Sequence, residues 1–318
     1  MRRELGQRSF AEALVRGGGN ARLEGISGLI DWSRLEELLS GVYSSATGRP
    51  SYGPLVLLKV LLLESWYGLS DPAMEEALGD RLSFRRFVGL GLDEDVPDHS
   101  TISRFRTLLA ERGLAERIFV EVGRQIEAQG LVVKSGTLID ATVIDAAAAE
   151  PPRQKGGGRS KADPDARWVK NKTLGSARFG YKLHAAVDQG TGIVRRAVVT
   201  AANVPEVEMG HDLVCGDEQA VYADKAYVSA RMRERLGAGK IKDRVQRRAN
   251  RWHALRPIEI RRNVLIGRIR GRIEGVFGTL KRSYGLARMR YMGLARNAAA
   301  TLMTLVAWNL ARAAARTA

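Results

Sequence analysis

The chain has 318 residues, 45% of them hydrophobic, and a formal net charge of +16. This length accommodates one or two domains with a substantial core, and the apolar content excludes a globally disordered chain. Its single cysteine, Cys215, excludes an internal disulfide and a cluster of thiolate metal ligands, so we expect it to be a small core residue.

The first 130 residues predict helices. Residues 33–43 carry apolar side chains at helical spacing, and residues 54–69 form the most apolar run, beginning at Pro54, where a missing amide hydrogen costs nothing. That run contains Lys59 and Glu64 and is too short to span a bilayer, so we interpret it as a buried helix. Further helices are expected over residues 71–80, 82–91 and 97–130.

The pattern changes to strands after Gly130. Residues 135–146 alternate and are rich in β-branched side chains, which predicts a strand. The segment 150–180 is rich in Pro, Gly and basic residues and is expected to be a long basic loop. Two further strands joined by the turn sequence DQGTG predict a hairpin, and AVYAD predicts a short buried strand. Residues 263–283 and 297–315 predict helices, the second packed on the sheet, whereas 228–262 shows no clear pattern.

This order of elements predicts an all-α N-terminal domain over residues 1–130 and an α/β domain over residues 131–318. The opening residues lack a continuous apolar core, so no signal peptide is expected and a cytoplasmic location follows. No membrane association is expected.

The positive charge is concentrated in one quarter of the chain. Residues 225–296 contain 21 Lys or Arg and 4 acidic residues, whereas the remainder is close to neutral. Such a patch indicates a polyanionic partner. Nucleic acid fits better than an anionic membrane because the segment lacks an apolar face rich in Trp and Phe.

Three acidic residues stand out because of their surroundings. Asp140 lies inside the apolar sequence TLIDATVID, Asp224 ends the run AVYAD, and Glu274 is the one acid in the basic segment 268–291. A carboxylate in an apolar strand is costly unless it is paired or binds a metal. Three carboxylates that meet at one sheet edge repel each other, which favours a divalent cation, and ligands that are all oxygens suit Mg²⁺ or Mn²⁺. Such ions activate water and stabilise the leaving oxygen of a phosphodiester.

Each acid also has an ordinary structural interpretation. Asp140 could form a strand-end turn, and Asp224 could cap the turn that follows it. Glu274 could pair with Arg270, one helical turn away. Asp145 is predicted to face the other side of its strand and to be a turn residue.

The spacing of the basic segment favours the catalytic interpretation. Arg270, Glu274 and Lys281 fall within about 40° of one another around a helix. Glycines recur in the same segment, each costing about 1 kcal/mol in a helix interior, and close approach to a sheet or a phosphate backbone is their simplest explanation. They are Gly267, Gly271, Gly275 and Gly278.

The run Arg270-x3-Glu274-x6-Lys281 resembles the Y-x2-R-x3-E-x6-K signature of bacterial insertion-sequence transposases of the DDE type. The best match is the insertion sequence five family, within the insertion sequence four-like superfamily; Gly267 stands where the signature has Tyr. LIDATVIDA and VYADKAY resemble the two aspartate strands of that family, and residues 179–213 resemble the segment that links them. LSFRRFVGLGL and PDHSTISRFRTLL resemble its N-terminal helical domain, so the likeness covers nearly the whole chain.

The resemblance implies an RNase H-like catalytic domain in which Asp140, Asp224 and Glu274 are the catalytic residues and hold Mg²⁺ or Mn²⁺. It implies hydrolysis at the transposon end, followed by attack of the freed 3′-OH on target DNA. The partners would be double-stranded DNA, at terminal inverted repeats and at the target, and a second copy of the chain, in the bacterial cytoplasm at the nucleoid. The basic side chains expected to contact DNA are Arg268, Arg270, Arg272, Lys225 and Lys281.

Several alternatives stay open. The helices over 54–108 are candidates for a helix-turn-helix-like unit that reads the inverted repeats, with a plain helical bundle or a dimer interface as the alternative. His184 and Asp188 could lie near the site or be structural, and Trp168 and the loop 150–180 could touch flanking DNA or be a disordered linker. The protein could also be a catalytically silent, domesticated DNA-binding protein, or a metal-dependent nuclease without strand transfer.

Overall fold

The computed structural model describes residues 20–42, 52–152, 158–170, 177–249, 252 and 254–317. The chain divides into two compact units, one comprising Met1–Gln129 with Ala299–Ala318 and the other comprising Gly130–Ala298. The division near residue 130 coincides with the predicted boundary. The C-terminal residues from Ala299 onward, predicted to belong to the sheet domain 131–318, belong instead to the helical unit.

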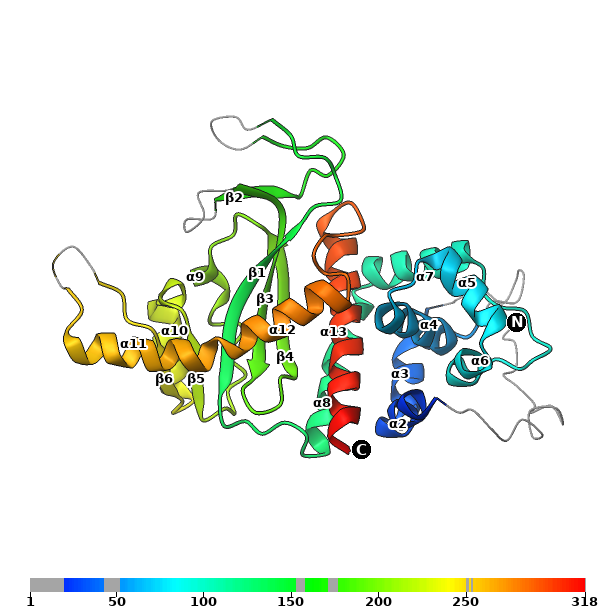
Figure 1. Ribbon diagram of the computed structural model, residues 1–318, viewed down its shortest axis with the longest axis horizontal. Coiled ribbons are helices and arrows are strands. Elements are labelled where there is room, and N and C mark those ends of the chain that lie inside the picture. Colours follow the sequence, from blue (N-terminus) through cyan, green and yellow to red (C-terminus); the bar gives the residue numbers. More distant parts are fainter. Residues whose placement is uncertain are drawn as a thin grey trace. The chain divides into compact units, whose positions relative to one another are not determined.

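The first unit consists of helices (Figure 1). Its apolar helix α4 begins at Pro54 and ends at Tyr67, and the capping residue Gly68 takes the left-handed conformation with φ 66°. Ten of the fourteen residues of α4 are buried, as predicted for a core helix. The helices that begin and end in this unit are α2 (Ala21–Leu29), α3 (Trp32–Leu39), α4 (Pro54–Tyr67), α5 (Asp71–Asp80), α6 (Leu82–Val88), α7 (His99–Glu111) and α8 (Leu114–Ala128).

Helix α13 (Leu294–Thr317) contributes its residues from Ala299 onward to this unit. There the indole Nε1 of Trp66 donates a hydrogen bond of 2.8 Å to the carbonyl oxygen of Ala307. An Ala-rich helix can pack on helices as well as on a sheet, so its composition could not distinguish the two. By length and composition α13 could cross a bilayer, but most of its apolar stretch is buried inside the protein, as in a core helix.

The second unit contains a six-stranded mixed sheet. Strand β1 lies in its middle, antiparallel to β3 on one side and parallel to β5 on the other, and β6 continues parallel beyond β5. Strands β2 and β4 pair antiparallel with successive stretches of β3. The strands are β1 (Thr137–Asp145), β2 (Arg167–Lys170), β3 (Ala177–Asp188), β4 (Val194–Ala201), β5 (Ala220–Ala223) and β6 (Lys242–Val245).

The β3–β4 hairpin turns at the predicted sequence DQGTG. The Oδ1 atom of Asp188 accepts hydrogen bonds from the backbone amides of Gly190 and Thr191, at 3.1 and 2.9 Å. Gly192 has φ 76°, a conformation that other residues rarely adopt. The turn residues therefore determine where this hairpin reverses.

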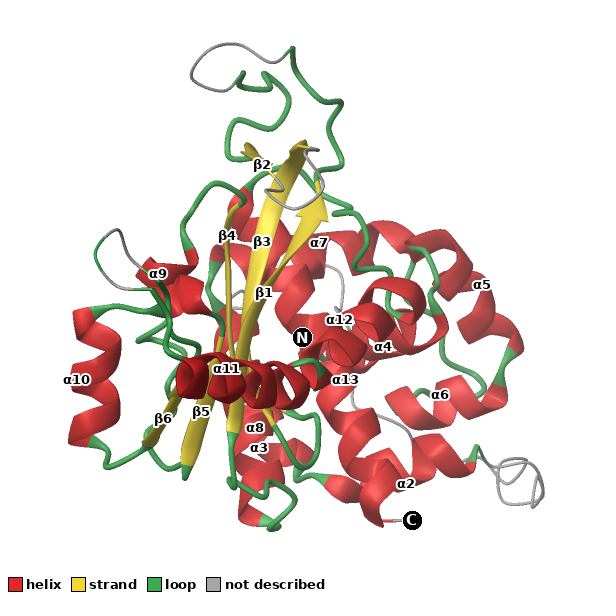
Figure 2. Cartoon of the chain, turned by 60° about the vertical axis from the view of Figure 1, so that its left-hand side comes forward, coloured by secondary structure: helices red, strands yellow, loops and turns green. Residues whose placement is uncertain are grey.

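Helix α11 crosses the sheet, as Figures 1 and 2 both show, and α12 follows it along the chain. The single helix predicted over 263–283 is therefore two helices that meet at Gly271. Gly271 keeps nearly helical dihedral angles, φ −53° and ψ −18°. The two helices therefore continue in almost the same direction, and the spacing of apolar residues does not reveal the break between them. The helical segments that lie wholly in this unit are α9 (Glu206–Met209), η1 (Lys225–Tyr227), α10 (Ala230–Ala238), α11 (Pro257–Arg270) and α12 (Arg272–Ser283).

Two segments predicted without regular structure contain strands. Arg167–Lys170 forms β2 inside the predicted basic loop 150–180, where the ring of Trp168 packs 5.4 Å from that of Phe179. Residues 153–157 and 171–176 of that loop lie outside the described residues. Strand β6 and helix α10 likewise fall within the unassigned segment 228–262. Both strands are only four residues long, and neither shows the alternation of polar and apolar residues that marks a half-buried strand.

Candidate active site

Asp140 and Asp224 follow register partners on adjacent parallel strands. Strands β1 and β5 are in register at Ile139 and Ala223, and the next residue after each is an aspartate. The sheet thereby brings together two acids that are 84 positions apart in the chain. Asp224 also caps the turn η1, since its side chain accepts the backbone amide of Lys225, the structural role that the sequence left open for it.

The carboxyl group of Asp140 is mostly buried, with 19% of its side chain exposed. Burial raises the pKa of Asp140 to about 6; the guanidinium of Arg270 opposes this rise, and the charges of Asp224 and Glu274 add to it. Asp140 is therefore a carboxylate at neutral pH that requires a nearby cation. In the DNA-free protein that cation is Arg270.

Arg270 connects the first and third predicted catalytic acids. Its Nη1 forms an ion pair with Oδ2 of Asp140, and its Nη2 lies 3.9 Å from Oε1 of Glu274. The Arg270 side chain is 18% exposed, whereas Glu274 is 69% exposed. The structure therefore links helices α11 and α12 to strand β1 through one guanidinium and leaves Glu274 facing solvent.

The donor set suits a hard divalent cation. Asp140, Asp224 and Glu274 supply carboxylate oxygens alone, the ligands that Mg²⁺ and Mn²⁺ prefer, and a cationic group already sits on Asp140. Within the described ranges, no group of three His, Cys, Asp or Glu side chains is arranged to hold a metal ion as it stands. Joint binding of a cation by the three acids would therefore require Arg270 to leave Asp140 and Glu274 to turn inward.

The second signature cation, Lys281, also faces strand β1. Its Nζ donates a hydrogen bond of 2.9 Å to the carbonyl oxygen of Val143. Burial lowers the pKa of Lys281, and the charge of Arg178 lowers it further. The other basic residues predicted to contact DNA are exposed: Arg268, Arg272 and Lys225.

Close approach to the sheet does not explain the two glycines of α12, Gly275 and Gly278. A Cβ atom at Gly275 would meet no atom of the described residues within 4 Å, and one at Gly278 would meet Nη2 of Arg282 at 4.0 Å. That explanation is therefore wrong for both positions, because Gly275 faces open space and the atom nearest to Gly278 belongs to its own helix. A Cβ at Gly267, in contrast, would lie 3.3 Å from Nε2 of Gln246.

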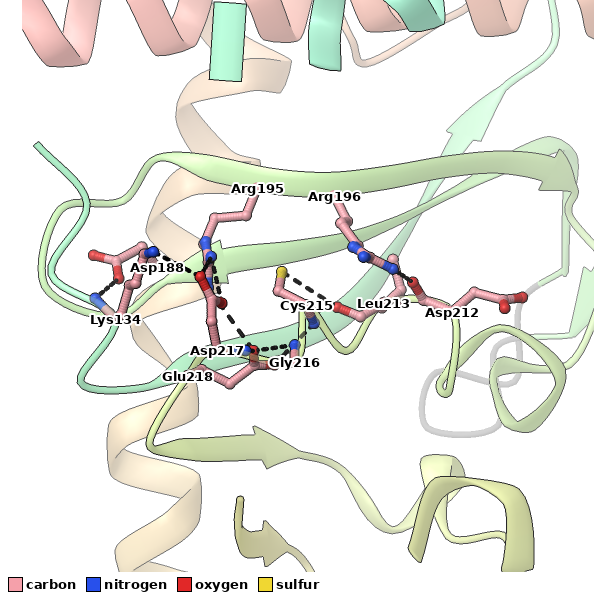
Figure 3. A network of polar contacts seen from close by, with 10 residues as sticks. All are labelled: Lys134, Asp188, Arg195, Arg196, Asp212, Leu213, Cys215, Gly216, Asp217 and Glu218. Carbon is pink, nitrogen blue, oxygen red and sulfur yellow. Dashed lines mark hydrogen bonds and ion pairs between the residues drawn. The ribbon is translucent and has the colours of Figure 1, made fainter. Parts of the chain in front are cut away.

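Asp188 lies beside the first residue of β1, three register positions before Asp140. It pairs with Thr137, the first residue of β1, and its Oδ2 accepts the backbone amide of Lys134 at 2.9 Å. Figure 3 shows it within a polar network that joins the chain before β1 to the β3–β4 turn. Of the two roles that the sequence left open for Asp188, near the site or structural, its contacts support the structural one.

The loop before β5 closes the same network. The carboxylate of Glu218 accepts the backbone amides of three consecutive residues, 215–217, and Arg195 pairs with Asp217 at 2.6 Å (Figure 3). Cys215 in this loop is partly buried. Burial raises the pKa of its thiol to about 11, so it is an unreactive thiol.

Two other candidates have structural partners. His184 is buried, its Nε2 lies 3.0 Å from Oγ1 of Thr200, and burial lowers its pKa to about 4. It pairs with the residue after Asp140, so strand alternation puts the two side chains on opposite faces of the sheet. Asp145 forms an ion pair of 2.8 Å with Arg178.

Tyr227 is a polar site residue that the sequence did not reveal. It ends η1, three residues after Asp224, and it is fully buried. Its hydroxyl has no hydrogen-bond partner among the described residues, and the same holds for Nε of Arg270. Burial, followed by the charge of Asp140, raises the pKa of Tyr227 well above its usual value. In VYADKAY this tyrosine looks like one more apolar core residue, so the pattern concealed its buried hydroxyl.

Comparison with known families agrees with this geometry. Residues 133–310 match the family described as Transposase DDE domain, and residues 11–108 match the one described as Transposase domain (DUF772). The first match covers more than half of the chain, so the protein belongs to the DDE transposase family. It is a DNA-binding enzyme of the insertion-sequence transposase class. No solved structure matches the chain.

Proposed function

We propose that this transposase cleaves DNA at the terminal inverted repeats of its element and transfers the freed 3′-OH into target DNA. The observation that carries the proposal is the placement of Asp140 and Asp224 directly after register partners on adjacent parallel strands, with Arg270 linking Asp140 to Glu274. The strand order β4-β3-β1-β5-β6, antiparallel in its first part and parallel in its second, supports an RNase H-like domain. The signature around Glu274 supports the insertion sequence five family.

In this proposal the three acids hold Mg²⁺ or Mn²⁺, which supplies Lewis acidity and an activated water when bound. Asp140 and Asp224 are the fixed ligands because each is anchored to a strand, whereas Glu274 approaches from the solvent side. Arg270 donates to DNA phosphate with its planar fork and Lys281 as a point charge. Further sequence-independent affinity comes from exposed basic residues. These are Arg268, Arg272 and Lys225.

The N-terminal helices are the proposed reader of the inverted repeats. Helix α4 is buried over most of its length and is unsuited to enter a groove, so base contacts would fall to the helices packed around it, α5 to α7. Handling two transposon ends requires a second copy of the chain, so we propose a homodimer in the synaptic complex. We further propose that the protein acts in the bacterial cytoplasm at the nucleoid.

Substitution of the second aspartate tests the proposal. Asp224→Asn should abolish cleavage of a duplex bearing the element's end while DNA affinity stays within a few-fold, because one carboxylate oxygen is replaced by a neutral amide. Asp212→Asn, at a side chain 58% exposed in the same unit, is the matched control and should cleave normally. Cleavage by Asp224→Asn at the wild-type rate would exclude Asp224 from the site.

A pre-cut end separates the remaining alternatives. A transposase should join the 3′-OH of this pre-cut DNA end to target DNA. Cleavage without joining would identify a nuclease, and binding without either reaction would identify a silent DNA-binding protein.

A further inference from the structure

Position 267 is where this chain departs from the signature that it otherwise matches, since glycine replaces tyrosine. Gly267 lies in α11, three residues before Arg270. The space next to it is not empty: a Cβ atom there would lie 3.3 Å from Nε2 of Gln246. That distance is tighter than most contacts of a real Cβ, so a side chain at 267 would require the amide of Gln246 to move from its present position.

Gln246 reaches this point from the sheet. Strands β5 and β6 are in register at Ala223 and Val245, so Gln246 follows β6 as Asp224 follows β5. Its backbone amide donates to the carbonyl oxygen of Ala223 at 3.0 Å, directly before Asp224. Its side-chain Nε2 donates to the carbonyl oxygen of Asn263 in α11 at 2.9 Å. One residue thus connects the strand that carries Asp224 to the helix that carries Arg270.

The neighbouring contacts hold Gln246 in this position. Asn263 uses both ends of its amide on the backbone of Arg247: Oδ1 accepts the amide at 2.8 Å and Nδ2 donates to the carbonyl oxygen at 3.0 Å. Arg262 donates to the carbonyl oxygens of Val245 and Asp243, both at 2.8 Å. Helix α11 therefore grips the end of β6 on either side of Gln246.

We propose that Gln246 is a positioning residue of the carboxylate site, and that its amide occupies the space beside α11 that a side chain at position 267 would otherwise fill. Its amide fixes the separation between Asp224 and helix α11, and hence between Asp224 and the acids that Arg270 connects. This inference rests on the proposed function of the three acids.

A rescue experiment tests the exchange. Direct calorimetric binding of Mn²⁺ to the full chain in complex with end DNA is compared for Gln246→Ala, Gly267→Tyr and the double variant. Each single variant should weaken Mn²⁺ binding about tenfold, the usual size of an effect from outside the metal's own ligands. Gln246→Ala loses the amide, and Gly267→Tyr displaces it. The double variant should recover to within about threefold of wild type, because the tyrosine then enters the vacated space.

Gln219→Ala is the matched control. This exposed glutamine precedes β5 at its opposite end and should leave Mn²⁺ binding unchanged. The proposal fails if the single effects multiply in the double variant, or if Gln246→Ala behaves like the control. Asp224→Ala, measured in parallel, isolates the proposed function. If Asp224→Ala retains full Mn²⁺ affinity, the proposed carboxylate site is wrong. If Asp224→Ala loses Mn²⁺ binding but Gln246→Ala binds Mn²⁺ like the wild type, only the positioning role of Gln246 is overturned.

Discussion

The guanidinium of Arg270 sits on the carboxylate of Asp140, the residue that the proposed reaction requires as a metal ligand. The guanidinium of Arg270 and the proposed metal ion would therefore compete for the carboxylate oxygen atoms of Asp140. A phosphate of bound DNA is the natural competitor for Arg270, because a guanidinium matches phosphate geometry as well as it matches a carboxylate. Arrival of DNA would therefore free Asp140 at the moment when a metal ion is needed.

Replacing Arg270 should have opposite effects on metal binding and on catalysis. In the DNA-free protein, Arg270→Gln should bind Mn²⁺ at least about tenfold more tightly, a factor equal to about 1.4 kcal/mol, because no internal cation has to be displaced. Cleavage of end DNA should fall, because the phosphate contact is lost. Calorimetry with Mn²⁺ alone and a cleavage assay measure the two effects.

Arg268→Gln is the control, because it removes the same charge from an exposed position of α11 and should leave Mn²⁺ binding unchanged. If Arg270→Gln binds Mn²⁺ no more tightly than the wild type, the ion pair between Arg270 and Asp140 does not block the metal.

Lys281 is predicted to contribute one phosphate contact. Lys281→Ala should weaken binding to all DNA sequences alike and reduce the slope of log K against log [salt] by about 0.9, the value for one phosphate. Lys281→Arg should keep the slope, because the charge is retained. Fluorescence anisotropy over a range of salt concentrations measures both variants. A slope identical to that of the wild type would remove Lys281 from the DNA path and leave it as a structural donor to Val143.

The sequence predicted the paired acids because each is anomalous in a strongly apolar neighbourhood. TLIDATVID and AVYAD are strands by pattern, and an acid within or at the end of such a strand demands an explanation. The ion pair between Arg270 and Asp140 could not be predicted in this way. It depends on how α11 crosses the sheet, and no local pattern encodes a contact between residues 130 positions apart.

The elements that the sequence missed share a physical cause. Strands β2 and β6 are short and lack an alternating pattern, and they owe their conformation to pairing with β3 and β5 rather than to their own side chains. Gln246 follows such a strand, so its role was hidden with it. The departure at Gly267 was visible in the sequence, but the side chain that faces it comes from another element.

Gly275 faces open space on α12, one residue after Glu274, so its glycine has no explanation within the described protein. Gly275→Ala should stabilise the DNA-free protein by up to about 1 kcal/mol, because alanine is the better helix former. It should weaken DNA binding if a phosphate backbone passes over this position. Urea unfolding and anisotropy measure the two effects.

Gly123→Ala provides the comparison for Gly275. Gly123 lies inside α8, again with no described atom within 4 Å of an added Cβ, but in the helical unit. It should show the gain in stability without the loss in affinity. If Gly275→Ala also binds DNA normally, the backbone does not approach α12 at this residue.

The helical unit contains a buried acid whose titration should be visible in stability. Glu64 accepts a hydrogen bond of 2.6 Å from Nη2 of Arg106, which also pairs with Asp71. Burial raises the pKa of Glu64 to about 7 from 4.5, against the opposing effect of Arg106. A raised pKa in the folded state means that the folded chain binds the proton more tightly than the unfolded chain. The stabilisation is complete below about pH 4.5 and is lost as the pH rises through about 7.

Glu64→Gln should therefore flatten the dependence of stability on pH between 5 and 8. The amide cannot lose a proton, and Arg106 keeps its two hydrogen bonds to Asp71, at 2.9 and 2.8 Å. One titrating proton limits the wild-type slope to about 1.4 kcal/mol per pH unit. Urea midpoints of the full chain at a series of pH values measure it, with Glu116→Gln, an exposed acid of α8, as the charge-matched control. A slope that persists unchanged in Glu64→Gln would mean that Arg106 keeps Glu64 ionised throughout, so that the attraction between the pair outweighs the cost of burying the charge.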